Sequence, residues 1–484
     1  MAFKLFNTLS RSVQEFTPLD PAGKLAGMYC CGPTVYDFAH IGNWRTFVFG
    51  DLLRRYLEFK GYQVTHVMNI TDIEDKIIKR VHETKTTLKE FTGKYEAEFV
   101  EDLKTLNCRM PHQTPRATEF MSDIIALIEK LIRRGIAYKA ADGSVYFSIE
   151  KYRGCGCTYG QLVKLNFDEM RVGERVKSDD YAKESVADFA LWKARVPEDG
   201  NVFWPSPWGE GRPGWHIECS AMSMKILGPS FDLHLGGEDL VFPHHEDEIA
   251  QSEGAGMQSN GQRFVKHWVH GAHLLVEGKK MSKSLGNFFT LRDLLDKGFT
   301  GREVRYLLLT AHYRETFNFT LDGLQGVRTA LARIDECLGK LREIAGDVSA
   351  EPEMPSQLIN KFSEALDDDL NVSRAWAAVF EWVRHTNLWY GLVRDYESDP
   401  NFNRATKAIE AAAKLAEWRI IDSVLGVGAK TETEVPPEIM ALAEARTAAK
   451  KAKDFKRADA IREELKAKGW AIEDTAKGPK LKKI

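Results

Sequence analysis

Two segments far apart in the chain carry residue types suited to binding a polyphosphate. They are His40-Ile41-Gly42-Asn43 and Lys280-Met281-Ser282-Lys283-Ser284, the second a short polar loop with two lysines. A histidine at a helix start can donate to phosphate oxygens, and the helix N-terminus adds roughly half a positive charge. Alone, the first segment is also typical of any helix start and the second of a solvated turn. Together, in this order, they predict one nucleotide site with a cationic loop that closes on its ligand.

Four other residues form a candidate zinc set, because zinc in proteins is bound by thiolates, imidazoles and carboxylates. They are Cys31, Cys219, His244 and Glu248. A lone cysteine is more often a small core residue, and a lone histidine–glutamate pair is more often a surface contact. The prediction therefore depends on the set as a whole. Cys155-Gly156-Cys157 is too tightly spaced for the usual zinc knuckle, and we expect no metal there.

Helix and strand geometry selects among neighbouring residues of this set. In the helix expected after position 243, His244 and Glu248 are four residues apart and share a face, whereas His245 has no acidic partner at that spacing. Of the two adjacent cysteines, Cys31 lies at the end of a strand, and Cys30 should point to the strand's opposite face and pack there.

The elements that position these residues follow an α/β pattern. Residues 24–31, 41–60 and 63–68 have the composition of a strand, a helix and a strand. This βαβ unit predicts a parallel sheet with a ligand crevice at the carboxyl ends of its strands, where His40 falls. A second α/β half, with strands at 231–235 and 267–276, leads into the lysine loop.

Other patterns interrupt and follow these halves. Asp142-Gly143 lies between two apolar segments, a hairpin signal that predicts an antiparallel insertion. Long helical patterns follow over 302–344, 357–398 and 403–424. A hinge at Gly426, Gly428 and Pro436-Pro437 precedes two short helices.

Length and composition limit the class of protein. A chain of 484 residues is too long for one core, and 43% hydrophobic residues with 11% aromatics are typical of globular domains. No apolar run approaches the roughly 18 residues that span a bilayer. Seven cysteines at irregular spacing do not resemble a disulfide framework. We expect a soluble protein of a reducing cytoplasm with no membrane partner.

The two phosphate-binding segments resemble the signature motifs of class I aminoacyl-tRNA synthetases, and further motifs resemble the cysteinyl-tRNA synthetase family. These motifs are residues 29–37, 69–76, 188–193, 214–222 and 242–248. The resemblance implies an α/β, Rossmann-like parallel-sheet catalytic domain with an insertion, then an all-α helical bundle and a small α-rich anticodon-binding domain. The expected divisions are 1–104 and 206–300 for the catalytic halves, 105–205 for the insertion, 301–425 for the bundle and 426–484 for the C-terminal domain.

The resemblance also assigns residues. ATP binding falls to Thr34, His40, Gly42, Asn43, Lys280 and Lys283, of which His40, Asn43, Lys280 and Lys283 are catalytic. The class pattern ends its first motif with histidine, whereas position 43 is asparagine, which can still donate a hydrogen bond. The family's zinc ligands match Cys31, Cys219, His244 and Glu248 one by one. The amino-acid pocket is assigned to Thr71, Trp215, His234 and Asp239, which could instead be a strand-end cap, a core aromatic, a satisfied core histidine and a surface acid.

The implied reaction has two steps. The carboxylate of L-cysteine attacks the α-phosphate of ATP, supplied with Mg²⁺, and the terminal ribose of tRNA(Cys) then takes the cysteinyl group from the adenylate. Serine differs from cysteine by one atom, too little for a shape-based pocket to reject strongly. One bound zinc ion that prefers a thiolate could supply the roughly 5 kcal/mol that a ~10⁴-fold discrimination requires. We therefore expect no editing domain. A monomer is implied by the resemblance only.

Two other functions stay open at this point. A ligase that passes activated cysteine to an amino-sugar would share the zinc and ATP motifs but lack the last small domain. A catalytically silent RNA-binding relative would be expected to lose residues such as His40, Lys280 and Lys283. The basic C-terminal segment, from Arg446 to Lys483, is either a solvated amphipathic face or a contact for the tRNA backbone, with Trp470 as a base-stacking platform.

Overall fold

The structure is a computed structural model that describes residues 2–163, 188–258, 261–282, 286–399, 402–429, 437–452, 454–475 and 478–483. The chain forms two compact units, Met1–Val427 and Gly428–Ile484. Among the helices within these ranges, none combines the length and hydropathy that crossing a membrane requires.

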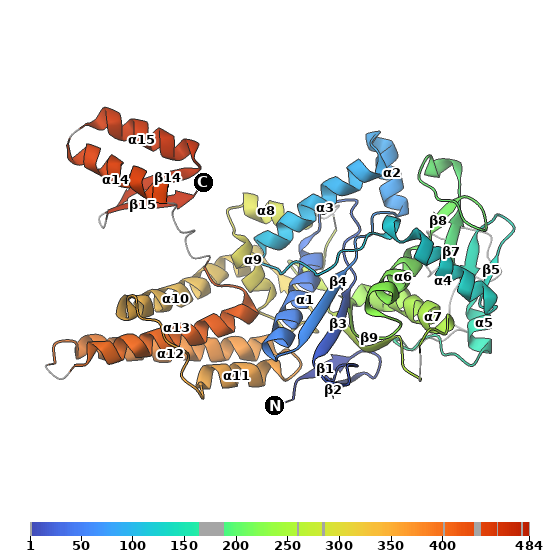
Figure 1. Ribbon diagram of the computed structural model, residues 1–484, viewed down its shortest axis with the longest axis horizontal. Helices are drawn as coiled ribbons and strands as arrows, with labels where there is room; N and C mark the ends of the chain where they lie inside the picture. The colour runs from blue at the N-terminus through green and yellow to red at the C-terminus, as the bar shows by residue number, and fades with distance from the viewer. Residues whose placement is uncertain are drawn as a thin grey trace. The chain divides into compact units, whose positions relative to one another are not determined.

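A parallel four-stranded sheet lies at the centre of the first unit, in the order β10-β9-β3-β4 (Figure 1). Its strands are β3 (Leu25–Cys30), β4 (Gln63–Met68), β9 (Phe231–Gly237) and β10 (Val265–Gly271). Strand β3 pairs with both β4 and β9, so the two α/β halves of the sequence form a single sheet. The predicted Rossmann-like parallel sheet is confirmed.

Helix α1 (Ile41–Phe59) connects β3 to β4 and packs beside the sheet (Figure 1). Fourteen of its 19 residues are buried. The helix packs closely on β3 at Gly50, where a Cβ would be in van der Waals contact with the Cys30 sulfur at 3.6 Å. The helix thus places its first turn at the carboxyl end of the sheet, where a ligand crevice is expected.

Between β4 and β9 the chain builds an antiparallel sheet and several helices. The sheet has the order β5-β6-β7-β8, with β5 (Ala137–Lys139), β6 (Val145–Phe147), β7 (Phe189–Ala194) and β8 (Gly211–Pro213). The helices before β9 are α2 (Asp75–Thr84), α3 (Leu88–Thr105), α4 (Met121–Arg133), α5 (Ile149–Gly154) and α6 (Trp215–Leu227), and α7 (Glu246–Gly254) follows β9. The hairpin predicted at Asp142-Gly143 is confirmed by the β5–β6 pairing.

The remaining helices of the first unit lie on the side of the parallel sheet away from the antiparallel one (Figure 1). They are α8 (Leu291–Asp296), α9 (Gly301–Leu308), α10 (Leu321–Ala345), α11 (Gln357–Leu366), α12 (Val372–Asp395) and α13 (Arg404–Leu425). Two predicted segments were wrong in detail. Strand β13 (Phe317–Phe319) interrupts 302–344, and a turn at 367–371 divides 357–398 into two helices.

Small sheets complete the first unit. The predicted strand 267–276 is two strands, because β10 ends at Gly271 and β11 (Leu274–Val276) joins another sheet. There β11 pairs with β12 (Lys279–Lys280) and β13. Strands β1 (Lys4–Asn7) and β2 (Ser12–Glu15) form an N-terminal hairpin.

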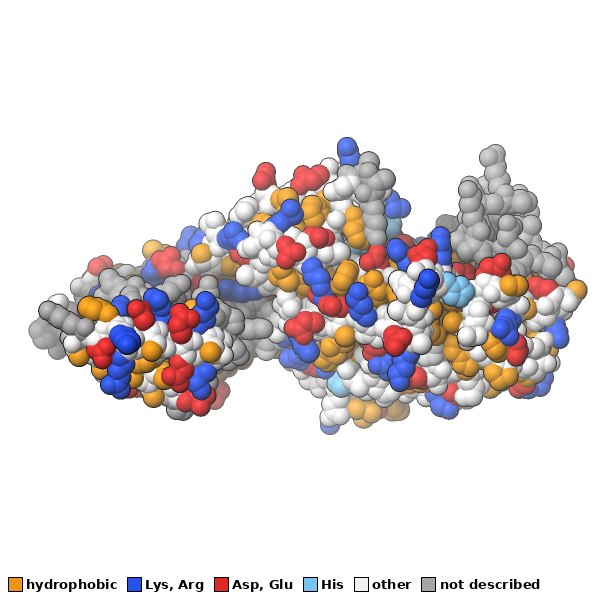
Figure 2. Space-filling model, turned by 90° about the horizontal axis from the view of Figure 1, so that it is seen from above, with side chains coloured by type: hydrophobic (Ala, Val, Ile, Leu, Met, Phe, Trp, Pro, Cys, Tyr) orange, Lys and Arg blue, Asp and Glu red, His pale blue; other side chains and the backbone are white. Residues whose placement is uncertain are grey.

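The second unit contains two helices and a hairpin. Its elements are α14 (Pro437–Lys451), α15 (Phe455–Ala467), β14 (Trp470–Thr475) and β15 (Gly478–Lys483). Trp470 is 6% exposed and packs in the core with Ile461 and Leu465. The stacking role predicted for Trp470 is therefore wrong. Basic and acidic side chains both occur on the face of this unit seen in Figure 2.

Candidate active site and metal centre

The four candidate zinc residues come together beside the carboxyl end of β3. Cys31 follows that strand, Cys219 lies on α6, and His244 and Glu248 lie on either side of the start of α7. All four are buried, and one possible ligand atom from each lies within 4.8 Å of the others. The Cys31 sulfur is 3.6 Å from His244 Nε2 and 3.9 Å from Glu248 Oε1, which is 3.1 Å from His244 Nε2.

These separations are close to the edges of a zinc tetrahedron, two of them lying just outside the regular range. With Zn–S bonds of about 2.3 Å and Zn–N or Zn–O bonds of about 2.0–2.1 Å, the edges of a regular tetrahedron are roughly 3.3–3.8 Å. The donor set of two thiols, one imidazole and one carboxylate is also one that zinc prefers. The residues present therefore fit a zinc ion by both distance and chemistry.

His245 also reaches the cluster, contrary to the prediction. Its Nε2 is 3.3 Å from the Cys31 sulfur and 4.0 Å from Glu248 Oε1. The predicted i, i+4 pair of His244 and Glu248 is confirmed, with His244 Nε2 3.1 Å from Glu248 Oε1. His245 was set aside because it has no acid at i+4, but it precedes Glu248 by three residues, a spacing that also shares a helical face. Residues 241–245 form a wide turn with an extended Phe242 (φ −141°, ψ 133°), and α7 begins at Glu246. Cys31, His234, His245 and Glu248 form a second set with ligand atoms within 4.8 Å of one another.

Hydrogen bonds orient the histidines of the cluster. His244 Nδ1 is 2.8 Å from His216 Nδ1, which leaves His244 Nε2 directed at the sulfur and the carboxylate. His245 Nδ1 is bonded to His270 Nε2 at 2.7 Å, and His270 Nδ1 is 2.7 Å from the Thr8 hydroxyl. Such partners fix the ring orientation of metal-binding and neighbouring histidines.

Two of the four candidate ligands, Glu248 and Cys219, favour the deprotonated form that binds a metal, whereas His244 favours its protonated form and burial raises the pKa of the Cys31 thiol. Burial opposes the charge on Glu248, but contacts with His234 and His244 lower its pKa to about 2. Burial likewise opposes charge on His244, yet hydrogen bonds to Cys219 and Glu248 raise its pKa to about 10. The hydrogen bond with Cys31 outweighs burial and, with His244, lowers the pKa of Cys219 to about 6. A deprotonated thiol and carboxylate are the forms that a metal requires.

The first of the two segments predicted to bind phosphate, His40–Asn43, caps α1. His40 Nδ1 accepts from the Asn43 backbone N–H at 3.2 Å, and Asn43 Oδ1 accepts from the His40 N–H at 3.1 Å. Because the oxygen of Asn43 is used in the cap, its side-chain NH₂ is the group that can donate to a ligand. The asparagine that departs from the class pattern therefore has a structural role at this position.

The two phosphate-binding segments meet in the structure. A Cβ at Gly42 would lie 2.7 Å from the Met281 methyl carbon and 3.0 Å from the His40 ring. Lys280 is exposed on β12, and its carbonyl accepts from the Asn287 side chain at 3.2 Å. The Asn287 side-chain oxygen Oδ1 accepts from the Ser282 backbone N–H at 2.8 Å. Lys283, the second predicted lysine, lies outside the described residues.

The other predicted residues occupy loops at the same edge of the sheet. Thr34 and Thr71 form a parallel bridge between the loops after β3 and β4, and buried Thr71 accepts from the Asn69 amide at 3.1 Å. Trp215 is 39% exposed, with its ring 4.5 Å from that of His244.

Two further predicted residues differ in burial. His234 is completely buried, stacks on Trp268, and places Nε2 3.0 Å from Glu248 Oε2. Asp239 is exposed in the short turn after β9.

Comparison with known proteins agrees with this arrangement. Residues 18–329 match the family of tRNA synthetases class I (C) catalytic domain, residues 361–429 the DALR domain, and residues 432–479 the Cysteinyl-tRNA ligase anticodon binding domain. The cysteine–tRNA ligase of Chlamydia muridarum is 46% identical over 485 residues, covering 99% of both chains. That of Chlamydia trachomatis serovar A is 45% identical with the same coverage. The chain belongs to the cysteine–tRNA ligase family.

Solved structures show the same fold at low identity. The Mycobacterium tuberculosis methionyl-tRNA synthetase in complex with methionyl-adenylate has a TM-score of 0.60 at 14% identity, over 83% of this chain and 90% of that one. The Agrobacterium radiobacter LeuRS–tRNA–LeuAMS complex has a TM-score of 0.58 at 13% identity, over 85% of each chain. This member of the cysteine–tRNA ligase family thus has the class I synthetase fold.

Sequence reasoning missed several residues of this site. His216, His245 and His270 were not assigned, although each lies one contact from the zinc set or its neighbours. His216 and His245 lie within the family motifs 214–222 and 242–248. His245 could have been found from its i, i+3 spacing to Glu248. The contacts of His216 and His270 depend on which elements pack together, and no spacing rule within one segment could have found them.

Proposed function

We propose that the chain activates L-cysteine with ATP and transfers the cysteinyl group to tRNA(Cys), and that a zinc site selects cysteine over serine. The observation that carries the proposal is the thiol-rich cluster at Cys31. It lies at the carboxyl end of the parallel sheet, as does the segment that begins at His40. A metal set and a phosphate site on adjacent loops suit a reaction that joins a sulfur-containing amino acid to a nucleotide.

Activation requires little acid–base chemistry from the protein. The carboxylate of cysteine is already a nucleophile, and it attacks the α-phosphate of ATP as pyrophosphate leaves. The chain's contribution is to orient the nucleotide and to stabilise charge on the phosphates. His40, the Asn43 amide and the N-terminus of α1 would bind the phosphates, and Lys280 and Lys283 would supply positive charge to them. ATP enters with Mg²⁺, which neutralises its phosphates.

The second step, transfer to tRNA, takes place at the same carboxyl end of the parallel sheet. The terminal ribose hydroxyl of tRNA(Cys) attacks the carbonyl carbon of cysteinyl-adenylate, and AMP leaves. We propose that the second unit holds the anticodon arm, because residues 432–479 match an anticodon-binding domain. That match favours tRNA over an amino-sugar as the acceptor.

Cys31, Cys219, His244 and Glu248 would hold the zinc ion. This set is favoured over the one with His234 and His245 because it contains two thiols and because His216 directs His244 Nε2 at the centre. When bound, zinc supplies a Lewis acid that prefers a thiolate to a hydroxyl. Trp215 and Thr71 would then line the cysteine pocket, with Asp239 toward the α-ammonium and His234 behind the cluster.

The free thiols also bear on location. All seven cysteines lack a disulfide partner, including the exposed Cys155. A reducing cytoplasm keeps such thiols free, and we propose that the enzyme acts there. That it acts as a monomer is proposed from the family resemblance alone.

Two assays on the purified protein test the proposal. Cysteine-dependent exchange of labelled pyrophosphate into ATP reports activation, and acid-stable labelling of tRNA(Cys) by cysteine reports transfer. We expect both, with Cys219→Ser losing zinc and nearly all exchange while retaining the fold. Absence of exchange in the unaltered protein would favour a silent RNA-binding relative. Exchange with transfer only to an amino-sugar would refute tRNA(Cys) as the acceptor.

A further inference from the structure

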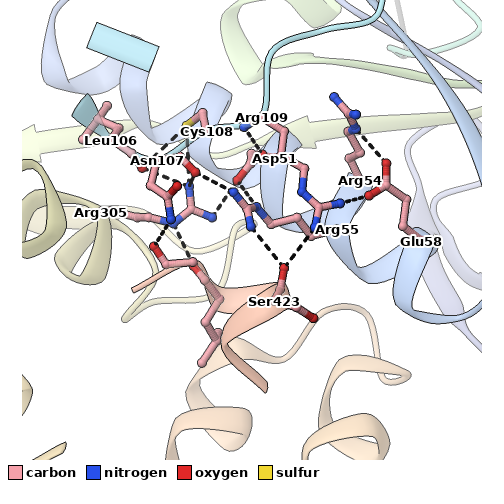
Figure 3. Close-up of polar contacts among 12 residues, drawn as sticks. Asp51, Arg54, Arg55, Glu58, Leu106, Asn107, Cys108, Arg109, Arg305 and Ser423 are labelled. Carbon is pink, nitrogen blue, oxygen red and sulfur yellow. Dashed lines mark hydrogen bonds and ion pairs between the residues drawn. The ribbon is translucent and has the colours of Figure 1, made fainter. Parts of the chain in front are cut away.

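The last helix of the first unit ends inside a group of arginine side chains. Helix α13 stops at Leu425, and Gly426 follows in the left-handed region with φ 66° and ψ 31°. A helix leaves its last carbonyls without partners inside the helix. Here donors from α1, from α9 and from the loop after α3 bind the carbonyls at the end of α13 (Figure 3).

Arg305 on α9 is the centre of this group and is completely buried. Its Nε donates to the Leu425 carbonyl at 2.7 Å, Nη1 to the Asn107 carbonyl at 3.3 Å, and Nη2 to Asp51 Oδ2 at 2.6 Å. A Cβ at Gly426 would lie 3.0–3.1 Å from the guanidinium. Glycine at this position therefore allows the arginine to lie directly against the turn.

Arg55 on α1 binds the same turn from the other side (Figure 3). Its Nε donates to Asp51 Oδ2 at 2.7 Å, Nη1 to the Ser423 carbonyl at 3.1 Å, and Nη2 to the Asn107 carbonyl at 2.6 Å. The Asn107 side chain in turn donates to the Gly426 carbonyl at 2.8 Å.

Arg302, one turn before Arg305 on α9, extends the contacts to the next residue of the chain. Its Nε donates to the Val427 carbonyl, and its two terminal nitrogens bind the two oxygens of Asp335 on α10 at 2.7 Å each. Arg109 Nη2 also donates to the Ser423 carbonyl, at 3.5 Å. The residues that bind the end of α13 and the two residues after it are named the α13 clamp. They are Arg55, Asn107, Arg109, Arg302 and Arg305.

The clamp is better suited to fixing a geometry than to adding stability. Arg305 and Arg55 converge on buried Asp51 and, against the effect of burial, hold its pKa below the ordinary value. Desolvation offsets most of what a buried ion pair gains, whereas the fixed directions of guanidinium hydrogen bonds define one arrangement. A helix end that needed only satisfied carbonyls could be capped by water or a single side chain.

The clamp also links two functional parts of the chain. Helix α1 begins at the His40–Asn43 segment and carries Arg55 12 residues after Asn43, about 18 Å along the helix axis at 1.5 Å per residue. On the other side, Val427 is the last residue of the first unit, and the chain continues into the unit that matches an anticodon-binding domain. The clamp therefore fixes where the chain leaves the first unit relative to the helix that starts at the nucleotide site.

We propose that the α13 clamp positions tRNA(Cys) for transfer by holding the exit of the chain toward the anticodon-binding unit, an inference that rests on the proposed function. The clamp residues act as positioning residues and touch neither ATP nor cysteine. Loosening the clamp weakens the contribution of the anticodon arm to tRNA binding and so lowers the efficiency of charging. The rate of cysteine activation stays unchanged.

The test uses Arg55→Lys and Arg302→Lys in the full chain. Both keep the positive charge but cannot make the same bonds to the Ser423, Asn107 and Val427 carbonyls. Arg302 is the milder change, because its side chain is 23% exposed. Arg328→Lys is the matched control, since Arg328 binds Glu303 and the Gly298 carbonyl near α9 and makes no bond to α13 among the described contacts. Each variant is assayed for pyrophosphate exchange, for charging of whole tRNA(Cys), and for charging of a minihelix with only its acceptor stem.

We expect both clamp variants to lose about tenfold in kcat/KM for whole tRNA, equivalent to about 1.4 kcal/mol and mainly through KM. Exchange and minihelix charging should stay within about twofold, as should all three activities of the control. Unchanged charging of whole tRNA would overturn the proposed positioning role of the clamp. Equal losses in all three assays would also overturn it, because they indicate a merely structural role. Absence of exchange in the unaltered protein would instead refute the proposed function.

Discussion

Two adjacent cysteines offer a sharp test of the metal centre. Cys31 and Cys30 are consecutive residues at the end of β3, and both are buried. The sulfur of Cys31 lies 3.6 Å from His244 Nε2, whereas that of Cys30 points to α1 and would lie 3.6 Å from a Cβ at Gly50. Replacing each by serine makes the same chemical change on opposite faces of the sheet.

The expected magnitude follows from the ligand set. Zinc sites in small folded peptides have apparent binding free energies of about 10–16 kcal/mol near neutral pH. If the four ligands share this about equally, removing one weakens zinc binding by roughly 3 kcal/mol, about 10²-fold. Cys31→Ser should therefore lose zinc to a chelator of intermediate affinity. Cys30→Ser buries a hydroxyl that costs about 1–3 kcal/mol of folding stability, but it should keep its zinc.

The assay measures zinc per chain by elemental mass spectrometry after dialysis against that chelator. Thermal unfolding and cysteine-dependent pyrophosphate exchange are recorded on the same samples. We expect zinc and exchange to be lost together in Cys31→Ser and retained in Cys30→Ser. Equal retention of zinc in both variants, or a greater loss in Cys30→Ser, would refute the assignment of Cys31 as a ligand.

Three further predictions concern other parts of the chain. His66 is 3% exposed, neither ring nitrogen has a hydrogen-bond partner among the described residues, and burial with nearby Arg54 lowers its pKa from 6.5 to about 3. Between pH 6.5 and 3 the unfolded chain binds a proton at His66 that the folded protein does not. The free energy of unfolding therefore falls as the pH drops below 6.5, by about 2 kcal/mol at pH 5. Urea unfolding at a series of pH values should show a smaller loss of unfolding free energy on acidification in His66→Leu than in the unaltered protein. An equal loss in both proteins would show that His66 is not the cause. Gly42→Ala should lower the rate of pyrophosphate exchange, because the new methyl group meets Met281 and His40, and Met281→Ala should restore part of it; no restoration would argue against the contact. Truncation after Gly428 should leave exchange intact and cripple tRNA charging, whereas equal loss of both activities would refute the assignment of tRNA binding to the second unit.

Much of the framework that positions the site could be predicted from local patterns. Helix α1 and strands β3 and β4 agree with the sequence to within one or two residues, because apolar periodicity, a capping segment and Gly61 all favour the same boundaries. Cys31, Cys219, His244 and Glu248 were recognisable because the motifs around them resemble those of the cysteinyl-tRNA synthetase family and because His244 and Glu248 have i, i+4 spacing.

The remaining features depend on tertiary structure. His245 was set aside because only the i, i+4 spacing was considered, and its contact with Cys31 joins segments more than 200 residues apart. Trp470 is an aromatic residue in a basic segment, a pattern that predicts base stacking, but it is buried by α15 and by the hairpin that it begins. The clamp around α13 joins residues more than 300 positions apart, such as Arg55 and Ser423, and no local pattern marks it. Contacts of this kind are set by which elements pack together.

The account depends most on the claim that a bound metal distinguishes sulfur from oxygen. The direct measurement compares pyrophosphate exchange with cysteine and with serine before and after zinc is removed by chelation, with zinc restored as a control. We predict that the holoenzyme prefers cysteine by about 10⁴-fold, equivalent to about 5.5 kcal/mol, and that the preference collapses without zinc and returns when zinc is added. A metal-free enzyme that remains active and still prefers cysteine to the same degree would contradict the account.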